Sequence, residues 1–192
     1  TAIIKGNNLR ISRKTTNLST ITLKKYQNSC QAIDDRGVSR STGIVRIEPA
    51  SDVLTVKSWK RAAKHFMGIL ECRIMDGELV LIIELSLEDY MKGIGEQPDT
   101  EPFQKQLAVA IAARSYAAHY MQEEYRKFPG MPYDLDDSPA RSQLFLGTYF
   151  QENNEAWVRA VEETAHTVLM VGDDILKAAY FSSSDGRTRS PE

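Results

Sequence analysis

Apolar and polar residues alternate through the first part of the chain, and this pattern predicts β-strands. The runs 3–15, 17–26, 43–49 and 52–59 are rich in Ile, Leu, Val and Thr, and turn-forming Gly, Asn and Asp residues separate them. Short segments of this kind are typical of strands that expose one face to solvent. We therefore expect a small sheet or barrel.

The strand-like pattern continues through residues 69–85, where Asp76 and Gly77 separate two apolar runs. Asp-Gly between two such runs is a strong signal for a two-residue hairpin turn. A β-hairpin is therefore predicted here.

The pattern changes after residue 100. Residues 101–128 are rich in alanine, and apolar residues recur at helical spacing, which predicts one long helix with Thr100 as its cap. A second helix is predicted over 153–165, capped by Asn153 or Asn154, and a hairpin over 167–184. The inward face predicted for the long helix contains Leu107, Ile111, Arg114, Ala118, Met121 and Tyr125.

These elements predict an α+β fold. Residues 1–70 form a β-rich N-terminal part, and residues 71–192 form a mixed core in which the long helix packs on strands. The abrupt end of the sequence suggests that the natural protein continues and that the core is incomplete at its C-terminal end.

Composition narrows the functional classes. Apolar residues make up 42% of the chain, which is enough for a real core, and 24 basic residues against 26 acidic ones leave a net charge of −2. A general nucleic-acid binder normally has a basic excess, so we expect no nucleic-acid partner. No apolar run approaches the roughly 20 residues of a membrane span.

The cysteines, Cys30 and Cys72, leave two alternatives open. They can form a disulfide or remain as separate buried thiols. No CxxC motif and no Cys/His cluster occurs, so a structural zinc site is not indicated.

Glu96 is the acidic residue whose neighbours in the sequence constrain the backbone most. It follows Gly93 and Gly95, precedes Pro98 and Pro102, and lies just ahead of the predicted long helix. A carboxylic acid held on a stiff loop beside a cleft can donate a proton to the leaving oxygen of a glycosidic bond. The alternative is an ordinary solvated loop residue.

Arg114 lies on the predicted inward face of the long helix, where an unpaired charge would be costly. A structural ion pair and contact with a substrate oxygen both remain open. A direct pair with Glu96 would hold that carboxyl ionised and oppose its role as an acid. The candidate protein partners are Glu84, Glu88, Asp89 and Glu96.

The stretch around these two residues resembles the SpoIID/LytB family, named for the stage II sporulation protein D. Three motifs carry the resemblance in order and spacing: LEDYMKG at 87–93, Glu96-x-Pro98 and AARSYA at 112–117. Weaker similarity follows at 133–135, 142–143, 147, 160–164 and 179–184, so the match covers about residues 74–190.

The resemblance implies a lytic transglycosylase that cleaves the bond between N-acetylmuramic acid and N-acetylglucosamine in peptide-free glycan strands of peptidoglycan. Glu96 would be the acid/base, and we expect no cofactor. The residues implied to bind the saccharide are Arg114, Tyr116, Ser182, Ser183 and Ser184. The substrate implies a location outside the cytoplasm, in the periplasm or cell wall.

This sequence departs from the family pattern in two places. Sporulation members carry zinc-binding cysteines and a histidine in the loop after Tyr133-Asp134, whereas this loop reads YDLDDSPARSQ. We expect no zinc there and another means of ordering the loop. Ser182 stands where the family often has His, and Asp185-Gly186 replaces Gly-Gly, which leaves an altered substrate preference or reduced activity open.

Two other functions remain alternatives. The chain can be a non-catalytic glycan-binding module that activates a cell-wall amidase, as relatives of the LytB type do. It can also be a hydrolase on the same scaffold. The products formed from peptide-free strands separate the three hypotheses.

Overall fold

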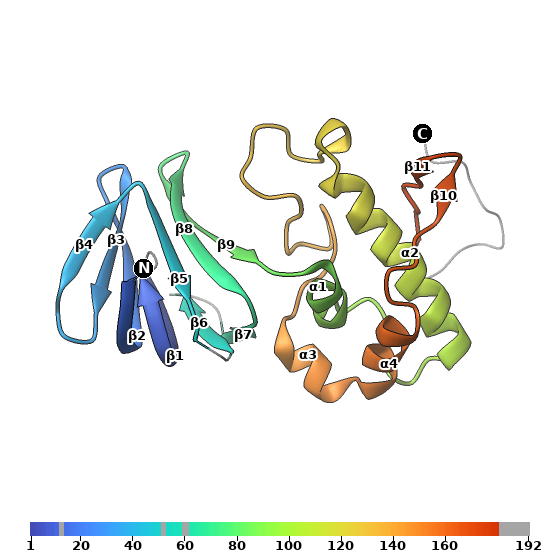
Figure 1. Ribbon diagram of the computed structural model, residues 1–192, viewed down its shortest axis with the longest axis horizontal. Coiled ribbons are helices and arrows are strands. Elements are labelled where there is room, and N and C mark those ends of the chain that lie inside the picture. The colour runs from blue at the N-terminus through green and yellow to red at the C-terminus, as the bar shows by residue number, and fades with distance from the viewer. Residues whose placement is uncertain (12–13, 51–52, 59–61, 181–192) are drawn as a thin grey trace. The chain divides into compact units, whose positions relative to one another are not determined.

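The computed structural model describes residues 1–11, 14–50, 53–58 and 62–180, and it divides the chain into two compact units (Figure 1). The first unit contains residues 1–86 and 146–149, and the second contains residues 87–145 and those from 150 onward. Strands build the first unit and helices dominate the second. The expected α+β class is confirmed.

Within the described residues, a nine-stranded antiparallel sheet forms the first unit. The hydrogen-bonded order is β4-β3-β2-β1-β5-β8-β9, and β6 pairs with β1 and β7. The strands are β1 (Ala2–Ile11), β2 (Lys14–Tyr26), β3 (Ser29–Asp34), β4 (Ser39–Thr42), β5 (Ile44–Glu48), β6 (Leu54–Ser58), β7 (Lys64–Phe66), β8 (Ile69–Met75) and β9 (Glu78–Glu84).

Alternating residues of these strands build the core of the first unit. In β3, Cys30, Ala32 and Asp34 are buried while the residues between them are half-exposed. β6 likewise buries Leu54 and Val56. Because successive side chains of a strand point to opposite faces, the alternation seen in the sequence buries one face and leaves the other in contact with water.

A disulfide joins two strands that are not neighbours in the sheet. β3 lies against β5 and β8, and Cys30 of β3 bonds to Cys72 of β8 with their Cα atoms 6.2 Å apart. Both cysteine side chains are fully buried. Of the two alternatives left open by the sequence, the structure shows the disulfide.

The predicted hairpin at 69–85 is confirmed as β8 and β9. Asp76 and Gly77 form its turn with φ angles of 49° and 76°, and Met75 pairs with Glu78. Two successive residues with positive φ are the conformation that Asp-Gly favours in such turns. Because β8 and β9 complete the first sheet, the observed division falls at Ser86–Leu87 and not at residue 70.

The second unit is built around one long helix. This helix, α2, packs against α1 and α4 and contacts β11 (Figure 1). The hairpin predicted over 167–184 is present as the short pair β10 and β11, whereas residues 176–180 form no strand and residues 181–184 lie outside the described residues. The elements are α1 (Leu87–Gly93), α2 (Phe103–Met121), a 3₁₀ turn (Glu123–Tyr125), α3 (Thr148–Asn153), α4 (Glu155–Glu163), β10 (Met170–Val171) and β11 (Asp174–Ile175).

The buried face of α2 differs from the predicted one. Of the predicted face only Arg114 is buried, and Met121 is 49% exposed. The helix packs on its alanine-rich side, because small side chains let the neighbouring helices approach closely. The prediction followed the large apolar residues and therefore missed this face. The buried residues of α2 are Gln106, Ala110, Ala113, Arg114, Ser115 and Ala117.

The ends of α2 also differ from the prediction. The helix ends at Met121, because Gln122 is extended with ψ 136°, and the 3₁₀ turn follows. Acidic Glu123 and Glu124 would oppose the dipole at the C-terminal end of a longer helix. At the other end Pro102 flanks the first turn, and Thr100 does not cap it.

Residues 146–149 return to the first unit through a close contact at Gly147. This residue has φ 71°, and a Cβ atom placed on it would lie 2.1 Å from the carbonyl oxygen of His65 and 2.9 Å from the ring of Phe66. Only glycine fits this position, because any side chain would collide with the backbone of β7.

Candidate active site around Glu96

Two backbone segments fix the position of Glu96. α1 ends at Gly93, and Ile94 then pairs with Phe145 in an isolated antiparallel bridge. The N–H of Gly95 donates to the carbonyl oxygen of Leu144 at 2.8 Å. In return, the N–H of Leu144 donates to Oε1 of Glu96 at 3.1 Å. The carboxyl group is therefore held by the backbone of a segment far along the chain.

The Glu96 side chain is half-buried. Among the described residues, none of the ion pairs includes it. Therefore no cation among these residues competes with a ligand for this carboxyl group.

Two tyrosines and a glutamine surround this carboxyl group and form what we name the tyrosine–glutamine cluster: Tyr90, Gln143 and Tyr180. Gln143 is 1% exposed. Its Nε2 donates to the hydroxyl of Tyr180 at 2.8 Å, and its Oε1 accepts from the hydroxyl of Tyr90 at 2.9 Å. The hydroxyl of Tyr180 also shares a hydrogen bond with Glu96. One buried amide thus orients both tyrosines.

The electrostatic setting keeps both phenols protonated. Burial raises the pKa of Tyr180, the hydrogen bond from Gln143 acts in the opposite direction, and the negative charge of Glu96 adds to the increase. Burial also raises the pKa of Tyr90, and the neighbouring Tyr180 and Glu96 act in the same direction. A phenol with a raised pKa remains a hydrogen-bond donor at neutral pH.

Tyr116, predicted to bind the saccharide, lies next to this cluster. Its ring meets the ring of Tyr180 edge to face, with the centroids 6.4 Å apart. The structure thus brings Tyr116 toward Glu96, and its contact with a saccharide stays a prediction. Ser182, Ser183 and Ser184 lie outside the described residues.

Arg114 occupies a different environment. It is fully buried, and its Nε and Nη2 donate to the two carboxylate oxygens of Glu88, both at 2.9 Å. Its other N–H groups bond to Val161 O at 2.9 Å, Thr164 Oγ1 at 3.2 Å and Thr167 O at 3.4 Å. This arrangement favours the structural ion pair, with Glu88 as its partner, over saccharide contact.

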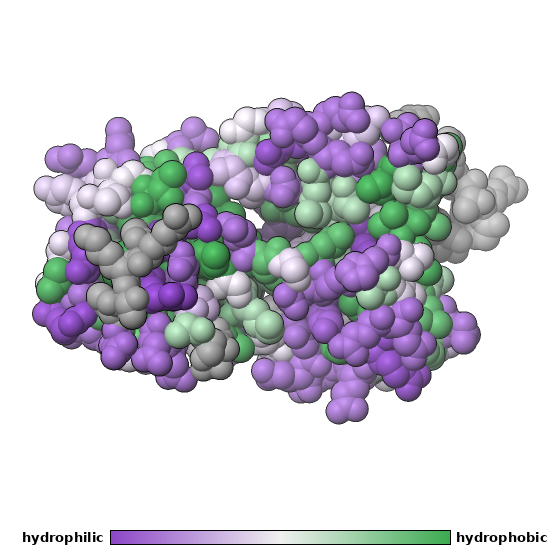
Figure 2. All heavy atoms as spheres, in the orientation of Figure 1, coloured by the Kyte–Doolittle hydropathy of each residue, from purple (hydrophilic) through white to green (hydrophobic). Residues whose placement is uncertain are grey.

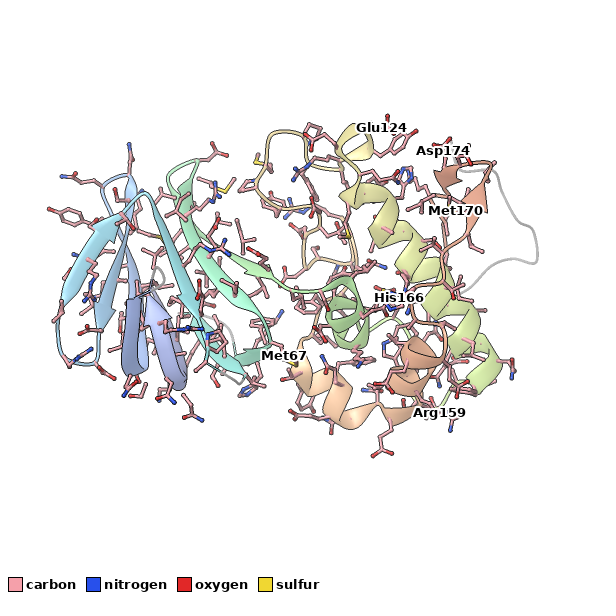
Figure 3. All side chains as sticks on the ribbon, in the orientation of Figure 1. Met67, Glu124, Arg159, His166, Met170 and Asp174 are labelled. Atoms are coloured by element: carbon pink, nitrogen blue, oxygen red, sulfur yellow. A yellow bond between two sulfur atoms is a disulfide. The ribbon has the colours of Figure 1, made fainter. Side chains whose placement is uncertain are left out.

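The charge of Glu88 is stabilised by the same network. Burial alone would raise the pKa of Glu88, but the hydrogen bonds from Arg114 and from the backbone N–H of His166, together with the charge of Arg114, lower it overall. His166, labelled in Figure 3, follows α4, and its N–H lies 3.2 Å from Oε1 of Glu88. This network joins α1, α2 and the segment after α4.

Asp99 ties the loop that follows Glu96 to α4. Its two carboxylate oxygens accept from the N–H groups of Ala156 and Trp157, each at 3.2 Å, in the first turn of the helix. Asn154 precedes this helix but makes no side-chain capping bond. A carboxylate at this place suits the positive end of the helix dipole. Asp99 therefore supplies the cap that the sequence assigned to an asparagine.

Arginines order the loop in which sporulation members of the family bind zinc. Nη2 of Arg126 donates to the carbonyl oxygens of Met131 and Tyr133 at 3.0 and 3.3 Å, and it pairs with Asp134 at 3.1 Å. Asp136 pairs with Arg141 further along. Within the described residues, no group of three or more His, Cys, Asp or Glu side chains is placed to hold a metal ion.

Tyr90, Gln143 and Tyr180 lie in motifs of the family resemblance, but the sequence alone assigns them no role. Gln143 stands 53 residues from Tyr90 and 37 from Tyr180, so only the fold shows that they meet.

The fold and the site define an α+β protein whose helical unit frames one half-buried glutamate with hydrogen-bonded tyrosines. The family model of the stage II sporulation protein (SpoIID) matches residues 75–171, half of the chain, so the chain belongs to this family. The family is associated with the remodelling of peptidoglycan.

One curated relative is an uncharacterized protein of Brachyspira hyodysenteriae, 29% identical over 117 residues. The match covers 59% of this chain and 30% of the relative, so the chain spans about a third of the length of that protein. No solved structure matches the chain.

The family and the Cys30–Cys72 disulfide are consistent with a location outside the cytoplasm, because disulfides persist in oxidising compartments. In the part of the chain that the structure describes, no helix has both the length and the apolar character of a membrane-spanning segment.

Proposed function

We propose that the chain is a peptidoglycan lytic transglycosylase in which Glu96 is the acid/base. The observation that supports this proposal most is the setting of Glu96. Its carboxyl group is half-buried, is held by Leu144 N–H and by the Tyr180 hydroxyl, and pairs with no cation among the described residues. A general acid needs fixed geometry and freedom from a permanent ion pair.

The reaction runs in two proton transfers. The protonated Glu96 gives its proton to the oxygen that links C1 of N-acetylmuramic acid to C4 of N-acetylglucosamine, and the bond from C1 to that oxygen breaks. The Glu96 carboxylate then takes the proton of the muramyl 6-hydroxyl, whose oxygen bonds to C1. The products are a 1,6-anhydromuramyl end and a free 4-hydroxyl. The carboxyl group regains its proton, and no water is consumed.

The tyrosine–glutamine cluster positions the acid during these steps. Gln143 orients the Tyr180 hydroxyl at 2.8 Å, and that hydroxyl together with Leu144 N–H fixes the carboxyl group. Hydrogen bonds to a charged group are stronger than neutral ones, so these donors favour the carboxylate that forms after the first transfer. In this assignment Tyr180 is a positioning residue.

The test compares Glu96→Gln with the parent chain on peptide-free glycan strands. The amide is nearly isosteric but cannot transfer a proton, so we expect the release of 1,6-anhydro ends to fall about a hundredfold or more. Glu101→Gln is the matched control, because Glu101 is a half-exposed partner of Lys105 away from the cluster. Mass spectrometry identifies the products. An unchanged rate in Glu96→Gln would overturn the proposal.

The same products test the hydrolase hypothesis. A transglycosylase releases an end that is lighter by one water than a reducing end and carries no solvent oxygen. Reactions run in water labelled with oxygen-18 distinguish the two, since a hydrolase would incorporate the label into a new reducing end.

One observation favours the second candidate, a non-catalytic activator of a cell-wall amidase. The β10–β11 hairpin and its flanks expose Leu169, Met170, Val171 and Leu176, and Figure 2 shows apolar residues gathered in this region. An exposed apolar group of this kind is typical of a protein-binding surface. Under this hypothesis Glu96→Gln still stimulates the amidase, Val171→Asp does not, and anhydro ends never form.

A further inference from the structure

Two lysines in the second unit differ from all its other described basic residues. Lys127 and Lys177 have no acidic partner among the described residues. Every other lysine and arginine described between residues 87 and 180 pairs with a carboxylate: Lys92 with Glu162, Lys105 with Glu101, Arg114 with Glu88, Arg126 with Asp134, Arg141 with Asp136 and Arg159 with Glu163.

The two unpaired lysines converge on the same aromatic ring. Nζ of Lys127 lies 5.1 Å from the ring centroid of Tyr120, and Nζ of Lys177 lies 5.7 Å from it. Lys127 also lies 5.2 Å from the ring of Tyr116 and donates a hydrogen bond of 2.5 Å to the hydroxyl of Tyr116. Lys127 is half-buried, so its charge has lost part of its hydration without gaining a carboxylate.

This positive group lies one aromatic ring away from the tyrosine–glutamine cluster. Tyr116, which accepts from Lys127, has its ring against that of Tyr180, and the hydroxyl of Tyr180 bonds with Glu96. A ligand that reaches Glu96 along this aromatic surface therefore passes a concentrated positive charge. That charge suits an anionic substituent of the ligand.

We propose that Lys127 and the hydroxyl of Tyr116 bind a carboxylate of the glycan substrate, with Lys177 adding positive charge at the rim. The ammonium of Lys127 has three N–H donors, and one of them is used by Tyr116. A second N–H and the Tyr116 O–H can each donate to one oxygen of a carboxylate. This inference rests on the proposed function, because it takes peptidoglycan glycan as the ligand.

The chemistry of the substrate identifies which carboxylate fits. The lactyl group of N-acetylmuramic acid ends in a carboxyl group, which is a neutral amide when the stem peptide is attached. The group becomes a carboxylate only when the peptide has been removed. A site of this kind therefore selects peptide-free strands through charge. Carboxylates within the stem peptide are the other source of the same chemistry.

The test measures binding to the Glu96→Gln chain, so that the ligand is not consumed. Three probes are used: peptide-free strands, the same strands with the lactyl carboxylate converted to its primary amide, and strands that retain their stem peptides. We expect the peptide-free strands to bind about tenfold more tightly than either of the others, as one charge-assisted hydrogen bond provides. Higher salt reduces the preference.

Lys127→Met, added to this chain, should reduce the tenfold preference to about one, and Lys127→Arg should retain most of it because the charge remains. Tyr116→Phe should lose part of it. Lys105→Met is the matched control and should change nothing, since Lys105 is committed to Glu101. Hydrogen exchange of α2 in each variant confirms that the helix is intact.

Equal binding of carboxylate and amide strands by the Glu96→Gln chain would overturn the inference. So would a preference that survives Lys127→Met in a folded variant. Tightest binding of peptide-bearing strands, abolished by Lys127→Met, would overturn the lactyl assignment and assign the site to a peptide carboxylate. All these outcomes are independent of catalysis, so they are distinct from a failure of Glu96→Gln to reduce activity in the parent chain.

Discussion

The two units bury different kinds of side chain. The first unit buries mainly apolar residues, and its buried acids, Asp34 and Glu71, each meet an arginine at 3.4 and 3.1 Å. The second unit buries Gln106, Arg114 and Gln143 as well. The bonds from Arg114 to Val161 O and from Gln143 to Ala113 O join residues far apart in sequence. Directional hydrogen bonds thus define the interior that presents Glu96, whereas apolar alternation and a disulfide define the sheet.

The largest expected effect concerns the disulfide. Replacing both Cys30 and Cys72 with alanine should lower the unfolding free energy of the first unit by about 4 kcal/mol, since the bond closes a loop with a sequence separation of 42. Hydrogen exchange of β3 and β8 measures the loss, with α2 as the internal reference. Equal loss of protection in α2 would show that the two units do not differ in this respect.

A variant at Arg114 tests how far hydrogen bonds stabilise the second unit. Arg114→Met removes the partner of Glu88 and leaves Val161 O and Thr164 Oγ1 without this donor, so the unit should lose about 3 kcal/mol. Exchange in α2 and α4 should increase while that of β3 and β8 stays constant. Lys105→Met, which breaks an i,i+4 pair, should cost only about 0.5 kcal/mol. If Arg114→Met also cost only about 0.5 kcal/mol, the hydrogen bonds of Arg114 would not stabilise the second unit in the way proposed.

A smaller effect is expected from Tyr180→Phe, which removes the hydroxyl and keeps the ring. The rate of anhydro-end formation at saturation should fall about tenfold, because one hydrogen bond to a charged group is lost. KM should stay nearly constant, since a positioning residue acts on the chemical step. Tyr26→Phe, at an exposed tyrosine of the first unit, is the control. If KM of Tyr180→Phe instead rose about tenfold, the tyrosine would contact the saccharide.

The smallest expected effect is the part of the acid dependence of the second unit that comes from Glu88. The pKa of Glu88 is lowered in the folded chain, so its stabilisation is present above the unfolded value near 4.5 and is lost as pH falls through the folded value. In a Trp59→Phe background, Trp157 is the remaining tryptophan and its fluorescence reports this unit. Glu88→Gln should remove this part of the acid dependence, and an unchanged acid profile would contradict it.

The sequence predicted those features that depend on local patterns. Alternation identified the strands, Asp76-Gly77 identified the hairpin, and the position of Glu96 ahead of a long helix was confirmed. The fold class follows from these local signals.

Features that depend on tertiary contacts were not predictable from the chain alone. The packed face of α2 combines alanines, which carry little apolar signal, with polar residues. Asp99, not a local asparagine, caps α4. The disulfide joins Cys30 to Cys72, and one hydrogen-bonded cluster joins Tyr90, Gln143 and Tyr180. These residues are far apart in the sequence, and only the fold brings them together.

The glycine-only position at Gly147 has a consequence for how this family member can be divided. The polypeptide leaves the first unit at Ser86, returns to it for residues 146–149, and leaves again, so this unit is discontinuous in sequence. A gene fragment starting at residue 87 would keep Gly147 and discard the β7 backbone against which it fits. Leu144, whose N–H holds Glu96, stands just before that return, so excision of the sheet would loosen the anchor nearest to the acid.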